Sequence, residues 1–284
     1  MIWRCALLLL ALSGLSACNT GMRLAYQNLD TLLRLEIGSH VELDPAQDAL
    51  LDGEFEPLLA WHRRNELPAY ALALRRTAEL VEQGSLDRTA VDGIADTIRA
   101  AVERLGEQAL PGIARLLASL DEAQVKELLA SQQKEWDEEL ETFEDETATE
   151  SLQRLTDKLE ERIENWVGPL KPAQRAYLSR RMAEADARGE FTDARLKAEA
   201  EQDQQAFAAL LATRQQTGFA ARLRALAYPQ DAVAEAERST RRERSRSFYT
   251  ALAATLTPKQ RAHLAKRLRS SANDASVLAA KPGP

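Results

Sequence analysis

Cysteine and histidine are scarce in this chain of 284 residues, which holds two cysteines and three histidines. Both cysteines, Cys5 and Cys18, lie close to the amino terminus. None of His40, His62 and His263 has a second His or Cys at the spacing of a zinc site. Beyond the two early cysteines the chain has no thiol for a disulfide or for nucleophilic catalysis. The sequence therefore predicts a core held by packing alone and no bound metal.

Motifs for phosphate binding and for covalent catalysis are absent as well. The 12 glycines form no phosphate loop, dinucleotide fingerprint or nucleophile elbow. Pairs of carboxylates are frequent, but they are expected on any acidic helix and indicate no particular reaction. We therefore predict no catalytic residues and no cofactor, and a protein that is not an enzyme.

Aromatic and β-branched residues are also sparse, with aromatics at 5% of the chain. No stretch alternates apolar and polar residues as a strand does. Ala, Leu, Glu, Arg and Gln dominate from Met22 to about Ser271, and these residues favour helices. The predicted fold is all-α, with long antiparallel helices in a bundle or cradle.

Residues 1–17 are predicted to be a cleaved lipoprotein signal peptide. Arg4 supplies positive charge, and the apolar run 6–12 is too short to span a bilayer. The run leads to Leu15-Ser16-Ala17-Cys18, which resembles the lipobox of bacterial lipoproteins. That resemblance implies that Cys18 carries acyl chains, palmitate among them. Because Asn19 is not Asp, the same resemblance implies an outer-membrane anchor on a protein that faces the periplasm.

A nine-residue pattern, Leu-x3-Gln-x3-Leu, recurs along the chain. Its copies are Leu43-Gln47-Leu51, Leu120-Gln124-Leu128, Leu170-Gln174-Leu178 and Leu256-Gln260-Leu264. Each copy predicts a helix start, because Asp44, Asp121 and Thr257 can cap the first turn and the Gln three residues later completes a capping box. Lys171 stands at this position in the third copy, and its side chain cannot accept the capping bond.

The spacing of the copies is uneven. Gln47 and Gln124 lie 77 residues apart and Gln174 and Gln260 lie 86 apart, whereas 50 separate the middle two. This unevenness excludes a regular solenoid. The similar outer separations leave open a duplication of a unit with two copies.

The domain prediction follows from this spacing and from composition. Residues 18–271 are predicted to form one helical domain, with 22–168 and 169–271 as its candidate halves. Residues 272–284 are rich in small and polar residues and are predicted to be a disordered tail.

The fourth copy, Leu256-Thr257-Pro258-Lys259-Gln260, resembles the LTxxQ motif of the periplasmic chaperone and stress-sensor family that includes Spy and CpxP. The other copies replace its Thr by Asp or Lys. The resemblance implies an all-helical, cradle-shaped dimer that binds unfolded protein. The alternative is that the pattern only starts helices, as it often does in helical proteins.

The segment 61–70 concentrates the most unusual side chains. Trp61, His62, Arg63, Glu66 and Tyr70 gather there, at a predicted corner between two helices, and are the candidate binding residues for an anionic or aromatic group. An enzyme with a site at this corner is a further alternative that rests on this segment alone. The structural interpretation, in which these side chains pack and pair with one another, is the commoner outcome for such groups.

A second resemblance includes this segment. Together with Leu24, Tyr26, Leu29, Leu43, Asp44 and Gln47, the segment 61–70 resembles an uncharacterised domain family of Gram-negative lipoproteins, most closely over residues 24–70. The resemblance implies a helical envelope lipoprotein and brings no known activity or site residues.

Charge divides the chain at Gly168. Residues 18–168 carry 15 Lys and Arg against 32 Asp and Glu, a net of −17, while residues 169–284 carry 21 against 12, a net of +9. The acidic segment (residues 135–150) and the basic segment (residues 238–246) are the extremes. We expect the two segments to dock on each other; the alternative is that the basic half faces an anionic lipid surface.

These observations predict a non-enzymatic, lipid-anchored envelope protein that acts as a binding or structural module. Its expected partners are the membrane, through the amino-terminal lipid, and an unknown envelope protein or anionic lipid surface. The net acidic charge disfavours nucleic acid as a partner. The oligomeric state stays open.

Overall fold

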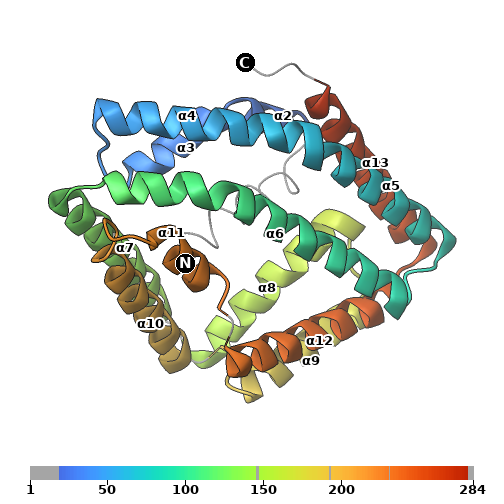
Figure 1. The fold of residues 1–284 in the computed structure, drawn as a ribbon. Coiled ribbons are helices and arrows are strands. Elements are labelled where there is room, and N and C mark those ends of the chain that lie inside the picture. Colours follow the sequence, from blue (N-terminus) through green and yellow to red (C-terminus); the bar gives the residue numbers. More distant parts are fainter. Residues whose placement is uncertain (1–18, 145–146, 192, 230, 281–284) are drawn as a thin grey trace.

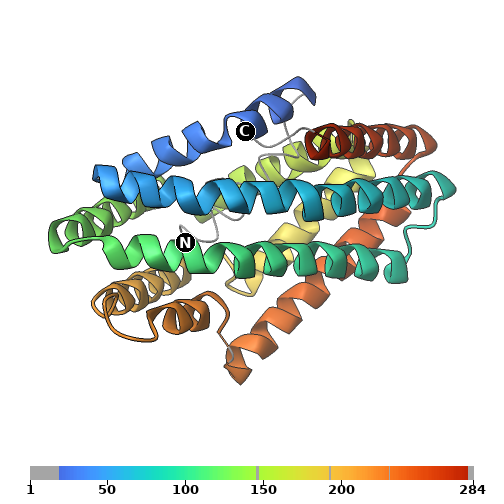
Figure 2. The same cartoon turned by 45° about the horizontal axis from the view of Figure 1, so that its top comes forward.

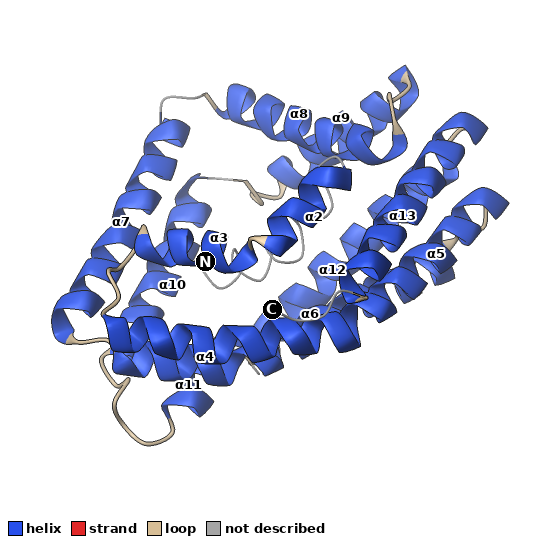
Figure 3. Ribbon diagram, turned by 90° about the horizontal axis from the view of Figure 1, so that it is seen from above, coloured by secondary structure: helices blue, strands red, loops and turns tan. Residues whose placement is uncertain are grey.

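The structure is a computed structural model that describes residues 19–144, 147–191, 193–229 and 231–280. These residues form helices and turns with no strand among them, which confirms the all-α prediction (Figure 3). The helical elements are α2 (Asn19–Gln27), α3 (Leu29–Gly38), α4 (Pro45–Trp61), the π-helical turn η1 (His62–Glu66), α5 (Leu67–Gln83), α6 (Arg88–Ser119), α7 (Glu122–Glu144), α8 (Ala148–Val167), α9 (Pro172–Ala187), α10 (Asp193–Leu211), α11 (Phe219–Ala227), α12 (Ala232–Ala254) and α13 (Pro258–Ala279). No helix in these ranges is both long enough and apolar enough to cross a membrane.

The helices lie as the sides of a frame rather than as one parallel bundle (Figures 1 and 2). α4, η1 and α5 follow one another, and α6 returns antiparallel beside α4, since Arg115 pairs with Glu54 while Arg104 pairs with Glu66. α13 lies antiparallel along α5. The predicted antiparallel pairs are therefore present. Each pair forms a side of the frame, and neighbouring sides meet at its corners.

Of the four buried apolar cores among the described residues, two have leucines of the repeated pattern as buried members, and these two lie at different corners of the frame. The first joins α6, α7, α10 and α11 and includes Leu120 and Leu128 of the second copy. The second joins α8, α9 and α12 and includes Leu170, Leu178 and Leu256 of the third and fourth copies. The pattern thus supplies core residues as well as helix starts.

The predicted tail of residues 272–284 is wrong for the part that the structure describes. α13 continues to Ala279, and Ala272 and Ala275 are buried against α5. Alanine is a strong helix former, and its small side chain lets two helices approach closely. The small residues that suggested disorder here instead allow α13 to pack closely on α5. Residues 281–284 lie outside the described residues.

The expected docking of the basic segment on the acidic segment does not appear among the described residues. The basic segment lies in α12, where Arg246 pairs with Asp96 of α6 at 2.6 Å. Arg244 pairs with Glu190, in the turn after α9, at 2.5 Å. The side chains of residues 139–146 lie outside the description. Arg244 and Arg246 therefore pair with carboxylates outside the acidic segment.

Candidate functional site at the joint between α4 and α5

The segment 61–70 is a continuous helical joint instead of the predicted corner. α4 passes into the π turn η1, in which the N–H of Leu67 donates to the carbonyl of His62, five residues earlier. Pro68 has no N–H, so the regular ladder of hydrogen bonds cannot pass through this point. Within the widened turn, His62 and Glu66 are both buried.

His62 is the centre of an aromatic cluster. Its Nδ1 lies 2.8 Å from the hydroxyl oxygen of Tyr26, and the two rings stack with their centroids 5.8 Å apart. The ring of Tyr70 meets His62 edge-on at 5.5 Å, and the guanidinium of Arg63 lies 5.6 Å from the centre of the Tyr26 ring. Burial lowers the pKa of His62 to about 4 against the opposing carboxylate of Glu66, and burial also raises the pKa of Tyr26 to about 12. His62 is therefore neutral at neutral pH.

Glu66 is the one buried carboxylate of the π turn, with 3% of its surface exposed. Arg104 of α6 binds both of its oxygens, at 2.7 and 2.9 Å. Burial, with the adjacent Glu66 charge as a second cause, raises the pKa of Tyr70. The bidentate pair joins η1 to α6.

Four of the five predicted binding residues share this cluster. His62, Arg63, Glu66 and Tyr70 contact common neighbours, whereas Trp61 is partly buried at the end of α4. The structure thus brings together a set of residues that the sequence had grouped only by proximity along the chain.

Sequence reasoning missed the partners that come from other elements. Tyr26 lies 36 residues from His62 and Arg104 lies 38 residues from Glu66. One turn before Tyr26, Arg23 donates to the buried carboxylate of Asp274 in α13 at 2.5 Å. A helical period connects residues three or four apart, so no local pattern could have indicated these pairs.

The polar groups of the joint satisfy one another's hydrogen-bonding capacity. Tyr26 occupies Nδ1 of His62, and Arg104 occupies both oxygens of Glu66. These bonds link α2, the α4–α5 joint and α6. The arrangement therefore fixes three elements relative to one another, which fits the structural interpretation of the segment.

The repeated glutamines form a second set of joints. Gln47 and Gln124 exchange amide hydrogen bonds: Gln47 donates to Gln124 at 2.8 Å and Gln124 donates to Gln47 at 2.6 Å. Each Oε1 also accepts the N–H of its own cap, Asp44 at 2.9 Å and Asp121 at 3.0 Å. The same amides donate to carbonyls at the partner helix start, those of Ser119 and Glu42.

The third and fourth copies repeat this geometry. Gln174 donates to Gln260 at 3.1 Å, and Gln260 donates back at 2.9 Å. Their Oε1 atoms accept the N–H groups of Lys171 and Thr257. As predicted, the side chain of Lys171 makes no capping bond. Each glutamine thus caps its own helix and holds a second helix start against it.

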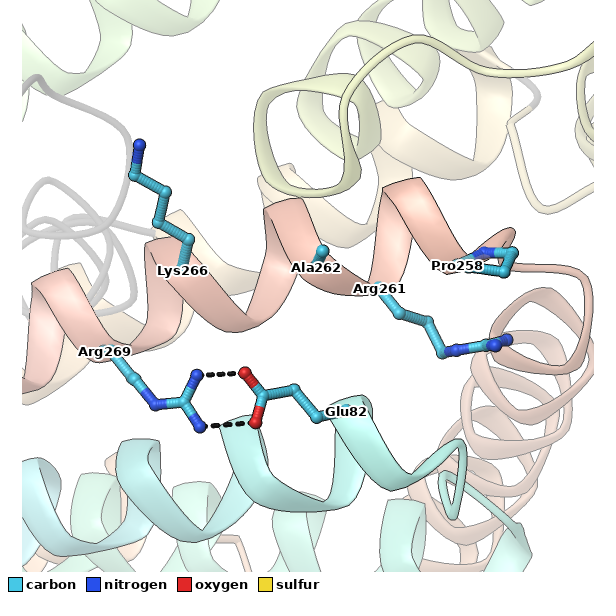
Figure 4. Close-up of a pocket in the computed structure, with 6 residues that line it drawn as sticks. All are labelled: Glu82, Pro258, Arg261, Ala262, Lys266 and Arg269. Carbon is cyan, nitrogen blue, oxygen red and sulfur yellow. Dashed lines mark hydrogen bonds and ion pairs between the residues drawn. The ribbon is translucent and has the colours of Figure 1, made fainter.

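A pocket of about 350 Å³ lies between α5 and α13 (Figure 4). It is lined by Glu82, Pro258, Arg261, Ala262, Lys266 and Arg269. Glu82 pairs with Arg269 through both oxygens, and Lys266 extends away from that pair. No pattern in the sequence indicates this pocket, because its two walls are far apart in the chain.

His40, the other buried histidine of the described chain, lies between α3 and α7. Its Nδ1 is 2.9 Å from the hydroxyl oxygen of Ser131, and carboxylates of Glu36 and Glu135 lie 3.7 Å from the ring nitrogens. Among the residues that the structure describes, no group of three or more His, Cys, Asp or Glu is placed to hold a metal ion.

The comparison with protein families gives one match. The model of a family of unknown function, DUF6279, matches residues 39–238. The match confirms the predicted uncharacterised family at that level, and the lipoprotein and chaperone resemblances stay predictions. Neither the curated proteins nor the solved structures contain a match to this chain.

Proposed function

Since the chain belongs to DUF6279, a family of unknown function, we propose a function from its own residues: a lipid-anchored, non-enzymatic envelope protein that acts as a binding or structural module. The proposal places it at the outer membrane, facing the periplasm. The observation that carries it is Leu15-Ser16-Ala17-Cys18, which follows a positive charge and a short apolar run. The first described helix begins at Asn19, the residue after Cys18.

The two sets of joints support a scaffold over an enzyme. The polar groups of the π turn bind one another, and the glutamines of the repeated pattern bind one another across helix starts. Such closed networks hold elements in place and specify a unique packing. We therefore propose that the frame presents a fixed surface to an envelope partner.

Burial of the pattern bears on the chaperone alternative. Gln47, Gln174 and Gln260 are buried, each with about 4% or less of its surface exposed. A side chain in that position cannot contact an unfolded client without opening the joint. Their burial favours a structural role for the pattern.

Acylation is tested with two cysteine variants of the full chain in a Gram-negative host. Cys18→Ser is expected to lose incorporation of labelled palmitate and to be released from membranes without detergent, because two or more acyl chains are needed for stable anchoring. Cys5→Ser, the matched control, should keep both properties. A Cys18→Ser chain that still requires detergent and still carries the label would refute the anchor.

The module is tested by crosslinking in intact cells followed by mass spectrometry. A stoichiometric complex with one envelope protein is expected. Suppression of client aggregation by the purified chain, without such a complex, would favour the chaperone alternative instead.

A further inference from the structure

The α2–α3 segment carries an apolar face that nothing in the described chain covers. Leu24, Leu32 and Leu35 are exposed to 54%, 46% and 66%, and α3 has no buried residue. The backbone ladder continues across the break between the two helices, since Leu32 N–H donates to the Asn28 carbonyl. Leu24 and Leu35, eleven residues apart, therefore lie three turns apart on the same face, with Leu32 beside them.

The opposite face of the segment is fixed to the frame. Arg23 pairs with Asp274, and Tyr26 pairs with His62. Arg34 pairs with Asp48 of α4 at 3.0 Å, and Ile37 packs on the core of α6, α7, α10 and α11. The exposed leucines therefore belong to a held element and not to a frayed end. Figure 2 shows this segment along an outer edge of the frame.

We infer that the α2–α3 segment lies on the surface of the bilayer that holds the lipid of Cys18, with Leu24, Leu32 and Leu35 inserted among the acyl chains. This inference rests on the proposed lipid anchor. Five residues separate Cys18 from Leu24, and α2 begins at Asn19, so the anchor brings this face next to the membrane before any other part of the fold. An amphipathic helix in such a position buries its apolar face at the boundary of headgroups and acyl chains.

Charge indicates which lipids the segment requires. Both arginines of the segment, Arg23 and Arg34, are paired with carboxylates of the frame. Asp30 and Glu36 add negative charge. No surplus of positive charge is left to attract anionic headgroups, so binding is driven by apolar burial and requires no anionic lipid.

The consequence is a fixed orientation of the frame. An anchor at one residue leaves a protein free to rotate about it, whereas a second, adjacent apolar contact holds one edge against the bilayer. The edge that carries α2 and α3 becomes the membrane side. The pocket between α5 and α13 and the basic segment of α12 then take defined positions relative to the membrane.

The test uses the mature chain with Cys18→Ser, so that no lipid contributes, and phosphatidylcholine vesicles in a sedimentation assay. The chain is expected to bind, with an affinity that salt changes little. Adding Leu24→Gln, Leu32→Gln and Leu35→Gln should lower the partition constant on the order of 100-fold. Each substitution removes the exposed half of a leucine side chain, which is the apolar area that the membrane would bury. Glutamine keeps the helix propensity of leucine, and circular dichroism checks that the fold persists.

The matched control is Ile98→Gln with Val233→Gln, which removes two apolar side chains of at least comparable exposure, 59% and 70%, from other helices. The control should bind as the parent does. Failure of the parent to bind, equal losses in both variants, or a parental dimer that the leucine changes dissociate would overturn the inference. Acylation of Cys18 is measured separately by mass spectrometry on the chain without substitutions. A failure of the lipid anchor is thereby distinguished from a failure of the α2–α3 segment to bind the bilayer.

Discussion

The pair formed by Gln174 and Gln260 offers the sharpest test of the fold. As a helix cap alone, Gln260→Ala should cost about 1 kcal/mol or less. The structure predicts more, because the buried amide of Gln260 also donates to the Pro169 carbonyl at 3.0 Å and exchanges bonds with Gln174. A buried polar group left without a partner costs about 1–3 kcal/mol. Gln174 keeps its bonds to Thr255, so we expect a total of about 2–3 kcal/mol.

A double-mutant cycle isolates the pairing from the capping. Gln174→Ala, Gln260→Ala and the double variant are unfolded in urea, with helix content followed by circular dichroism. Once one amide is gone its partner has already lost the shared bonds, so the double variant should cost about 1–2 kcal/mol less than the sum of the single variants.

The control is a capping box that contacts no second helix start. Thr147 and Glu150 form such a box at the exposed start of α8. Glu150→Ala should cost less than Gln260→Ala, because this box is exposed and its loss removes only the capping bonds. If Gln260→Ala costs no more than Glu150→Ala and the cycle shows no coupling, the paired joint is not a unit of stability.

Two further predictions concern the π turn. Because burial lowers the folded pKa of His62 to about 4, the unfolded chain binds a proton before the folded chain does as the pH falls below about 6.5. The contribution of neutral His62 to the free energy of unfolding is therefore present above that pH, and about 2 kcal/mol of it should be lost between pH 7 and pH 5. His62→Gln should remove this loss from the urea-unfolding curve measured at the two pH values, while His263→Gln, an exposed site, should leave it unchanged. Arg104→Ala should lower the free energy of unfolding by about 2 kcal/mol, less than for a fully buried pair because Arg104 is half exposed. Adding Glu66→Gln should restore part of that stability, because it removes the unpaired buried charge. If nothing is restored, the buried charge is not the cause of the loss.

The helices and their starts could be predicted from the sequence because their causes are local. Capping residues such as Asp44 and Thr257 act within one turn, and the scarcity of β-branched residues applies throughout. The all-α fold and the candidate residues His62 and Glu66 follow from such local signals. The prediction failed at the carboxyl terminus, where Ala272 and Ala275 of α13 pack against α5, and no local signal reports a helix so distant in the chain.

The partners of the candidate site could not be predicted for the same reason. Tyr26 and Arg104 reach the π turn from helices on either side of it in the chain. The docking hypothesis had the same weakness: net charge identified the basic segment, but the choice of carboxylate depends on which elements pack beside α12. Arg246 pairs with Asp96 of α6 because the two side chains lie 2.6 Å apart. Salt screens exposed charges that are separated by more than roughly 10 Å, so proximity decides which carboxylate an arginine pairs with.

The uneven spacing of the repeated pattern has a geometric reason in the frame. From Gln47 the chain runs out through α4 and α5 and returns through α6 to Gln124, 77 residues later, at the same corner. From Gln174 it runs out and returns through α9 to α12, reaching Gln260 after 86 residues. Between the two corners α7 and α8 carry the chain one way, so the middle spacing is shorter. Each glutamine pair therefore closes one long loop of the chain. A reciprocal pair of hydrogen bonds between distant residues does most to define the fold where it closes such a loop.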